Sequence, residues 1–337
     1  MKEYCVGVIG ALGAVGGQMR DILADSNINI GKVKMFERPE LEGEMAEFDG
    51  EEVPCEVATP ETLSECDVAT MSAGSAASEK LAPMAADVGC VVVDNSSQWR
   101  LDPEVPLVVP EVNPEDLDWH KGIIANPNCS TIQMMVALKP LHDYGTIKRV
   151  VVSTYQAVSG SGKKAFEGLK DETRQFIETG YIENPRAYHY PIAFNCLPHI
   201  DLFQEGGYTK EEYKMVNETK KILDEKIKVN ATCVRVPVLY GHSEMVNIET
   251  ETKITPEKAR ELLSKAPSIK VVDNVENNEY PMPLYSNNED LTMVGRIRED
   301  YTIERGLTLW VVSNNIRKGA ALNAVQVAET LIQRNIV

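Results

Sequence analysis

The sequence predicts an α/β protein of two domains: a doubly wound domain, and an α+β domain with a mostly antiparallel sheet. Short apolar strands alternate with helical stretches over the first 128 residues, which is typical of a parallel sheet covered on both faces. Longer runs rich in valine, isoleucine and threonine follow, with helices between them. At 337 residues, the chain is also long enough to bury two cores.

The predicted elements of the first domain are short and regularly spaced. A strand at Val6–Ile9 leads through a glycine-rich turn into a helix over residues 15–24. Further strands are predicted at residues 32–36, 68–71, 91–94, 107–110 and 122–125. Since such apolar strands alternate with helices, they predict parallel pairing.

The second domain is predicted to contain longer strands, at residues 147–155, 231–238, 246–252 and 307–313. Lysine- and glutamate-rich helices are expected at 209–228 and 256–266. The sequence of Gly180–Tyr190 has no periodicity, which predicts an irregular surface segment. Alanines at helical spacing within Gly319–Arg334 predict a last helix that returns to the sheet of the first domain.

Composition excludes several classes of protein. A net charge of −17 and a pI near 4.8 disfavour nucleic acid and anionic membranes as partners. No run reaches the length of a membrane span, and the N-terminus does not resemble a signal peptide. The seven cysteines are scattered without a CxxC pair, which argues against a zinc site and a disulfide framework. We therefore expect a reduced, cytoplasmic protein without a metal site.

The turn after the first strand predicts a dinucleotide site. It is G-x-x-G-x-x-G and consists of Gly10, Ala11, Leu12, Gly13, Ala14, Val15 and Gly16. Glycines there let the backbone approach a pyrophosphate, which the start of the next helix stabilises. We also place Ala73 and Gly74, which follow the third strand, among the cofactor contacts. The alternative is an ordinary strand–helix turn.

Two residues of opposite charge end the second strand. Glu37 can accept hydrogen bonds from the ribose hydroxyls of NAD, whereas Arg38 can pair with the 2′-phosphate of NADP. The residues alone leave the choice between the two cofactors open.

Cys129 follows a short apolar strand and a turn, at the expected start of a helix. The unpaired N–H groups of a helix start favour a thiolate, which is the nucleophile that acyl and aldehyde chemistry needs. The alternative is a small buried hydrophobic residue, as most free cysteines are.

Other side chains are weaker candidates when taken singly. His242 follows a β-rich run and can exchange protons near neutral pH, although a lone histidine is more often structural. Gln156 ends a strand before a glycine-rich loop. The basic residues Arg100, Lys221 and Arg235 lie at element ends, where each can equally be a solvated charge.

Further motifs extend in order from the first strand to the last helix. They are Pro127-Asn128-Cys129-Ser130-Thr131, Ser153-Thr154-Tyr155-Gln156-Ala157-Val158-Ser159-Gly160, Cys233-Val234-Arg235-Val236-Pro237-Val238, His242-Ser243-Glu244 and Val294-Gly295-Arg296-Ile297-Arg298. Together with the glycine motif, they make the chain resemble the aspartate-β-semialdehyde dehydrogenases.

The resemblance implies a Rossmann-type domain at residues 1–128 with 317–337, and a catalytic and dimerisation domain at 129–316. It also implies a homodimer or homotetramer. The family reduces L-aspartyl-4-phosphate with NADPH to the semialdehyde and phosphate, reversibly, in lysine, methionine and threonine biosynthesis.

The family's residue roles carry over position by position. Cys129 corresponds to the nucleophile that forms an acyl-thioester, His242 to the general acid/base, and Gln156 to the residue that orients the intermediate. The substrate residues correspond to Arg235 for the carboxylate, Glu218 for the amino group, Arg100 and Lys221 for phosphate, and Asn128 beside the nucleophile. The residues Ser159, Gly160 and Asn315 resemble positions near the nicotinamide and its phosphates.

The chain departs from the family pattern at three places. Asn126 stands where many relatives have a second cysteine, which leaves the nucleophile intact. Gly180–Tyr190 looks shorter than in some bacterial relatives. Glu37 and Glu40 occupy a loop where NADP-dependent relatives usually have small polar residues and an arginine, so NAD is an alternative to the implied NADP.

Three other functions are alternatives to this one. N-acetyl-glutamyl-phosphate reductases usually have glycine before their cysteine and an aromatic residue after it, where this chain has Asn128 and Ser130. Malonyl-CoA reductase is a further possible function, because some malonyl-CoA reductases resemble the same family. An inactive paralogue that serves as a binding subunit would typically lose the nucleophile, which is present here.

Overall fold

The computed structural model describes residues 2–287 and 289–337, in two compact units. Unit 1 is Met1–Asn128 with Ala320–Val337, and unit 2 is Cys129–Gly319. The sequence predicted the return to the first domain at residue 317, and the division in the structure lies at residue 320. The predicted fold class, a doubly wound domain followed by an α+β domain, is confirmed.

Among the described residues, unit 1 contains a seven-stranded sheet in the order β3-β4-β2-β1-β5-β6-β7. Its strands are β1 (Tyr4–Ile9), β2 (Ile30–Glu37), β3 (Met45–Phe48), β4 (Glu51–Val57), β5 (Val68–Met71), β6 (Val91–Asp94) and β7 (Ile123–Ala125). All neighbours pair in parallel except β3 and β4. The chain runs from β1 to β2 on one side and later continues at β5 on the other side, so the carboxyl ends of β1 and β5 flank the crevice where such folds bind ligands.

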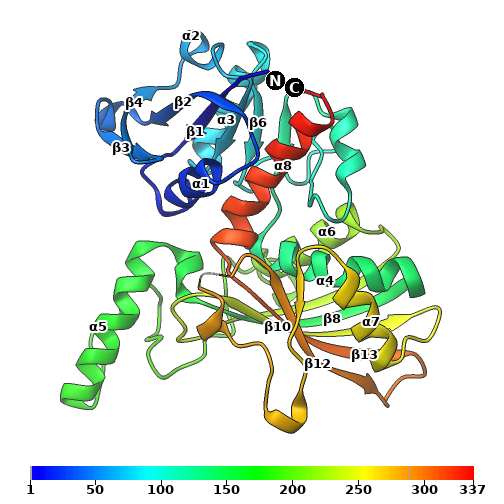
Figure 1. Cartoon of the computed structure of the whole chain (residues 1–337). Helices are drawn as coiled ribbons and strands as arrows, with labels where there is room; N and C mark the ends of the chain where they lie inside the picture. The colour runs from blue at the N-terminus through cyan, green and yellow to red at the C-terminus, as the bar shows by residue number, and fades with distance from the viewer. Residues whose placement is uncertain (1, 288) are drawn as a thin grey trace. The chain divides into compact units, whose positions relative to one another are not determined.

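Helices cover both faces of this sheet. They are α1 (Ala14–Ala24), α2 (Pro60–Leu63), α3 (Ser75–Asp87) and α8 (Leu322–Gln333). One core joins the sheet to α1 and α8, and the other joins it to α2 and α3. Figure 1 shows α8, near the C-terminus, beside α1 in this unit. The alanines of α8, Ala324 and Ala328, are fully buried, which lets the helix pack closely.

One predicted strand of unit 1 is wrong, and one hairpin of this unit was not predicted. The apolar run at 107–110 is not a strand, since only Leu107 forms an isolated bridge, to Ala125. The hairpin of β3 and β4 was not predicted, although Asp49 and Gly50 form its two-residue turn with φ angles of 51° and 80°. Asp-Gly is a strong hairpin signal, but these strands carry many glutamates and lack an apolar pattern.

Unit 2 has a six-stranded sheet among its described residues, in the order β11-β12-β13-β10-β8-β9. Its strands are β8 (Ile147–Gln156), β9 (Lys228–Arg235), β10 (His242–Thr250), β11 (Ile269–Val271), β12 (Thr292–Asp300) and β13 (Gly306–Ser313). The three central pairings are antiparallel, and the two outer ones are parallel. The expectation of a mostly antiparallel sheet is therefore confirmed.

The helices of unit 2 are α4 (Cys129–Gly145), α5 (Lys163–Thr179), α6 (Lys210–Ile222) and α7 (Pro256–Lys265). Contacts place α4 against β10 and β13, α6 against β9, and α7 against β11 and β12, so these three cover one face of the sheet (Figure 1). The helix α5 was not predicted. Gly180–Tyr190, which follows it, contains neither helix nor strand.

Short helical turns complete the chain. They are η1 (Pro39–Leu41), η2 (Pro114–Trp119), η3 (Val158–Ser161), η4 (Glu205–Gly207), η5 (Val275–Asn277), η6 (Pro283–Tyr285) and the π-helical turn η7 (Arg317–Ala321). No helix in the described part of the chain is both long and apolar enough to cross a membrane.

Candidate active site and nucleotide pocket

The glycine-rich loop of unit 1 has the close backbone contacts that its sequence predicts. Gly10 has a φ of +83°, and a Cβ on it would lie 2.6 Å from the Ser72 carbonyl oxygen. A Cβ on Gly16 would lie 2.0 Å from the Gly10 carbonyl oxygen. Both positions therefore require glycine. The first N–H groups of α1, which begins after Gly13, lack intrahelical partners and can receive an anion.

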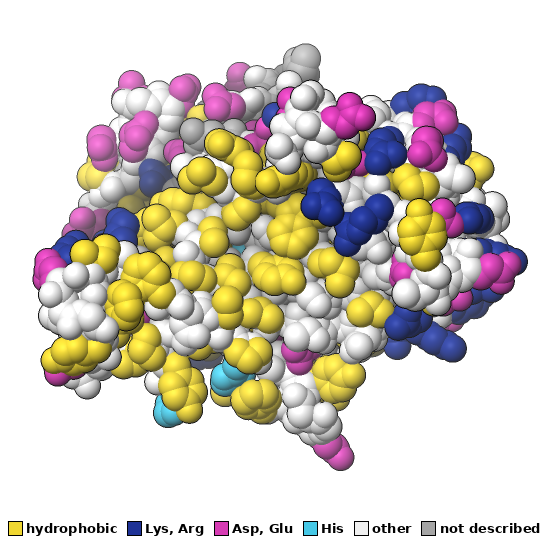
Figure 2. Space-filling view, turned by 90° about the horizontal axis from the view of Figure 1, so that it is seen from below, with side chains coloured by type: hydrophobic (Ala, Val, Ile, Leu, Met, Phe, Trp, Pro, Cys, Tyr) yellow, Lys and Arg dark blue, Asp and Glu magenta, His cyan; other side chains and the backbone are white. Residues whose placement is uncertain are grey.

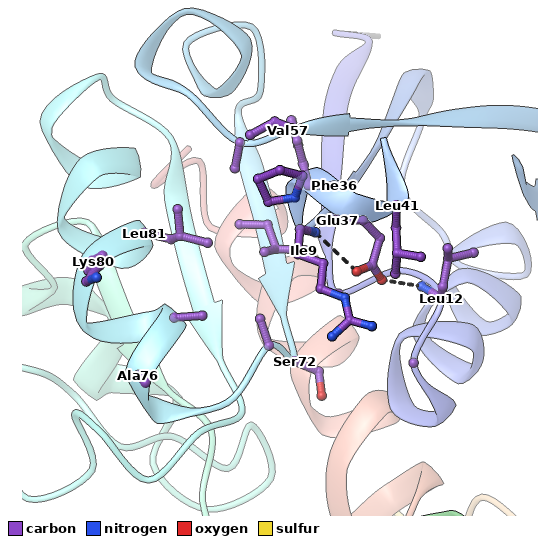
Figure 3. A pocket seen from close by; sticks show the side chains of 17 residues that line it. Ile9, Leu12, Phe36, Glu37, Leu41, Val57, Ser72, Ala76, Lys80 and Leu81 are labelled. Atoms are coloured by element: carbon purple, nitrogen blue, oxygen red, sulfur yellow. Dashed lines mark hydrogen bonds between the residues drawn. The ribbon is translucent and has the colours of Figure 1, made fainter. Parts of the chain in front are cut away.

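A cavity of about 740 Å³ lies beside this loop in unit 1 (Figure 3). Of the predicted cofactor residues, those that line it are Gly10, Leu12, Gly13, Glu37, Arg38 and Ala73. Ala11, Ala14, Val15, Gly16 and Gly74 are not part of its lining. Ala11 is buried in the core, and Gly74 precedes α3 with a φ of +81°. The cavity also contains Lys80, which was not predicted.

The Glu37 carboxylate is held beside the glycine-rich loop by hydrogen bonds to backbone N–H groups. Its Oε1 accepts a hydrogen bond from the Leu12 N–H at 2.8 Å, and its Oε2 accepts one from the Arg38 N–H at 3.3 Å (Figure 3). Arg38 is mostly exposed, and its Nε lies 3.9 Å from a carboxylate oxygen of Glu40. The negative charge at the end of β2 is therefore fixed by backbone, whereas the neighbouring positive charge is solvated.

In unit 2, α4 begins at Cys129, so the predicted position of the thiol at a helix start is confirmed. The residue is partly exposed, unlike most of α4, which is buried on all sides. A Cβ on Gly319 would lie 2.9 Å from the Cβ of Cys129. The chain can therefore pass beside Cys129 at that point only because residue 319 is glycine.

The side chain of Gln156, the last residue of β8, is tied to the start of α4. Its Nε2 lies 2.9 Å from Ser130 Oγ, 3.2 Å from Glu211 Oε1 and 3.3 Å from Thr154 Oγ1. Because the Glu211 carboxylate can only accept a hydrogen bond, it fixes which end of the amide is the NH₂ group. The Glu211 carboxylate is itself paired with Lys214, 2.9 Å away.

His242, the first residue of β10, is fully buried. Its Nδ1 accepts a hydrogen bond from the Ala157 N–H at 3.0 Å, so the proton of the neutral ring is on Nε2. That Nε2 is buried and has no partner among the described residues. Burial, followed by the positive charge of Arg235, lowers the pKa of His242 to about 3. The ring is therefore a neutral N–H donor at physiological pH.

This pKa predicts how stability changes with pH. Below pH 6.5 the unfolded chain binds a proton at residue 242 that the folded chain excludes, so folding should weaken as the pH falls. Between pH 6 and 4 the contribution approaches one proton, about 1.4 kcal/mol per pH unit. Urea unfolding of the wild type and of His242→Gln measures it, and the variant should lose this slope.

The exposed His189 supplies the control for that experiment. His189→Gln should leave the pH dependence of the unfolding free energy as in the wild type. Equal slopes for the wild type and His242→Gln would contradict a buried, neutral imidazole at residue 242.

Arg235 ends β9 and is almost completely buried. Its Nη1 donates to the Ala157 carbonyl oxygen at 2.6 Å, and its guanidinium lies 5.9 Å from the centre of the Tyr188 ring. A Cβ on Gly160 would lie 3.2 Å from Arg235 Nη1 and 3.3 Å from His242 Nε2. Gly160, which is exposed, therefore lies next to both the Arg235 guanidinium and the His242 ring.

Two of the predicted cofactor residues in unit 2, Ser159 and Asn315, are joined by a hydrogen bond. Asn315 Oδ1 accepts hydrogen bonds from Ser159 Oγ at 3.1 Å and from the Gly241 N–H at 3.0 Å. These contacts fix the loops after β8 and β13 and before β10.

The remaining predicted substrate residues lie in both units. Glu218 is buried and Lys221 half-buried; they are one turn apart on α6 and share a face of it. Arg100 and Asn128 belong to unit 1 and are buried, and Arg100 Nη2 donates to the Asn95 carbonyl oxygen at 2.8 Å.

Sequence reasoning missed Glu211, which contacts Gln156. A signal for it exists, because Glu211 precedes Glu218 by two helical turns and shares its face with the buried Met215. An acidic residue on the apolar face of an amphipathic helix indicates a buried charge. Among the described residues, no group of three or more histidine, cysteine or acidic side chains is arranged to hold a metal ion.

Comparison with known proteins covers both units. Residues 5–120 match the family described as "Semialdehyde dehydrogenase, NAD binding domain", and residues 138–318 match "Semialdehyde dehydrogenase, dimerisation domain". An aspartate-semialdehyde dehydrogenase of Aquifex aeolicus is 53% identical, over 99% of each chain.

Solved structures agree with this match. Aspartate semialdehyde dehydrogenase II of Vibrio cholerae, in complex with ASA, superposes with a TM-score of 0.94 at 43% identity, covering 99% of both chains. The enzyme of Candida albicans with NADP superposes with a TM-score of 0.79 at 25% identity, covering 100% of both chains.

Proposed function

The chain belongs to the aspartate-semialdehyde dehydrogenase family, and on that premise we propose that it interconverts L-aspartyl-4-phosphate and L-aspartate-4-semialdehyde plus phosphate. Its family makes it an NAD(P)-dependent oxidoreductase that acts on an aldehyde. The observation that carries the proposal is the partly exposed Cys129 at the first residue of α4, next to Ser130, which contacts Gln156. The reaction serves lysine, methionine and threonine biosynthesis.

Cys129 is the proposed nucleophile. In the reducing direction, its thiolate attacks the acyl carbon of the aspartyl phosphate, the C–O bond to phosphate breaks, and a thioester forms. Hydride from the reduced cofactor then adds to the thioester carbon, and the thiolate leaves as the aldehyde forms. The helix start favours the anionic sulfur that both steps need.

His242 and Gln156 are proposed to orient and stabilise the reacting group. The Nε2–H of His242 can donate to the carbonyl oxygen as it gains negative charge, which is the donor half of a general acid/base role. The acceptor half would require the other tautomer, whose Nδ1–H would face the Ala157 N–H. The bonds of Gln156 to Ser130 and Glu211 keep its amide in one orientation.

Charge and shape support the proposed substrate contacts. The planar guanidinium of Arg235 suits a carboxylate, and the carboxylate of Glu218 suits an ammonium group. Arg100 and Lys221 are proposed to bind the phosphate, as two cations suit a phosphate dianion. Asn128, beside the nucleophile, is proposed as a further substrate contact.

The proposed cofactor is NADP or NAD. The glycine-rich loop, Glu37, Arg38 and the cavity beside them support binding of the adenosine diphosphate part. Ser159, Gly160 and Asn315 are proposed to contact the nicotinamide part. None of the seven described cysteines is in a disulfide, which supports a place in the reducing cytoplasm.

A phosphate-dependent assay tests the function. Oxidation of L-aspartate-4-semialdehyde, followed by the appearance of NADH or NADPH, should require inorganic phosphate. Malonyl-CoA and N-acetyl-glutamyl phosphate, offered with reduced cofactor, should be turned over far more slowly than aspartyl phosphate. Absence of phosphate-dependent oxidation, or faster turnover of either of those substrates, would overturn the proposal.

We further propose that the uncovered face of the unit 2 sheet binds a second copy of the chain. Hydrophobic side chains gather on the face that Figure 2 shows. On the sheet, Tyr155 and Trp310 pack with ring centres 5.4 Å apart and line a cavity of about 460 Å³ with Met245. Exposed apolar patches of this kind mark protein interfaces. These strands also lie within the segment that matches the dimerisation domain.

A charge on this face should prevent association. Met245→Asp places a carboxylate among apolar side chains, so the protein should shift from dimer or tetramer to monomer in sedimentation velocity. Leu101→Asp makes the same type of change at an exposed apolar residue of unit 1 and should leave the assembly intact. An unchanged assembly of Met245→Asp would place the interface elsewhere.

A further inference from the structure

We propose that Glu37 makes this enzyme prefer NAD(H) to NADP(H), because it holds a carboxylate where the 2′ position of the adenosine ribose lies. Only the catalytic part of this inference rests on the proposed function. The selection itself concerns nucleotide binding by unit 1, which can be measured without turnover.

The position of Glu37 is set by the sheet and by the glycine-rich loop. Glu37 is the last residue of β2, which pairs in parallel with β1, so its side chain lies at the carboxyl end of the sheet. In doubly wound domains an acidic residue at this place accepts hydrogen bonds from the ribose hydroxyls of NAD. Glu37 lines the cavity together with Leu12 and Gly13 of the loop (Figure 3).

The hydrogen bond to Leu12 is what makes this residue selective. A carboxylate on a flexible side chain could turn away from a 2′-phosphate, but here Oε1 accepts from the Leu12 N–H at 2.8 Å. Turning away would break a hydrogen bond to a charged group and leave the Leu12 N–H without this partner. A ribose 2′-hydroxyl can donate to the carboxylate, whereas a 2′-phosphate would bring two negative groups together.

The nearby cations do not offset this charge. Arg38 and Lys80 also line the cavity, but both are exposed, and water and salt screen exposed charges. Arg38 additionally lies near the Glu40 carboxylate, at 3.9 Å. The charge that the backbone fixes in place is therefore the negative one, and it favours the nucleotide without the 2′-phosphate.

Calorimetric titration of the full chain with NAD⁺ and with NADP⁺ tests the inference. The wild type should bind NAD⁺ at least about tenfold more tightly, since one charge-assisted hydrogen bond is exchanged for a repulsion. Glu37→Ser should abolish or reverse this ratio. Glu42→Ser removes the same charge from an exposed residue outside the cavity lining and should keep the wild-type ratio.

Two results would overturn the inference: NADP⁺ binding as tight as NAD⁺ binding in the wild type, or equal ratios in Glu37→Ser and Glu42→Ser. A wild type that binds neither nucleotide would also overturn it. The ratio of kcat/KM for the two cofactors, with aspartate semialdehyde and phosphate, should change in parallel. If nucleotide selection is found but no oxidation occurs, the proposed function fails while the inference about Glu37 stands.

Discussion

Replacing Cys129 by alanine should lower phosphate-dependent oxidation of aspartate semialdehyde by more than about a thousandfold, since no other group can form the thioester. Cys129 is a small, partly exposed residue at the start of α4, so the change leaves only a small cavity, and the melting temperature should change little. Steady-state rates, together with thermal unfolding, measure both effects.

Cys196 provides the matched control for this variant. It is the exposed cysteine, and it lies in unit 2 as Cys129 does. Cys196→Ala should retain the wild-type rate. If Cys129→Ala kept an appreciable fraction of the rate, or if both variants lost activity equally, the nucleophile would be another residue.

Replacing Arg235 by leucine should raise the KM for aspartate semialdehyde by about a hundredfold or more, because two hydrogen bonds to a carboxylate would be lost. The KM for the cofactor should change much less. Arg235→Lys keeps the charge but lacks the planar pair of donors, so it should recover only part of the binding.

The same variant has a second, independent effect. The positive charge of Arg235 helps to lower the pKa of His242, so its removal should raise that pKa. The folded Arg235→Leu protein should therefore show a less steep loss of stability between pH 6 and 4 than the wild type. Equal increases in both KM values, with an unchanged pH dependence, would indicate that the guanidinium is only structural.

The parts of the site that local sequence predicts are those built from consecutive residues. Cys129 begins a helix because a strand and a turn precede it, and Glu37 ends a strand whose apolar pattern is clear. The glycines of the first loop are predictable for the same reason, because they lie between a strand and a helix in consecutive sequence. Each of these positions depends on a few neighbours in the chain, so pattern and residue type are sufficient.

The parts that the sequence does not predict depend on pairing between distant residues. Glu211 and Gln156 are 55 positions apart, so the apolar face of α6 can signal that Glu211 is buried, but the local pattern does not identify its partner. The burial of His242, and the backbone N–H that fixes its tautomer, likewise follow from the packing of β8 against β10. The family resemblance implies the role of His242, but the protonation state of its ring can be inferred only from the structure.

Unit 1 is assembled from both ends of the chain, and this has a consequence for how the protein is made. Ala324, Ala328 and Leu331 of α8 belong to the same core as β1 and β5. During synthesis on the ribosome, the core of unit 1 therefore cannot form completely until α8 has been made. Unit 2 is one uninterrupted segment, so it can fold before unit 1. We therefore expect a nascent or C-terminally shortened chain to expose an apolar sheet face and to depend on chaperones until synthesis ends.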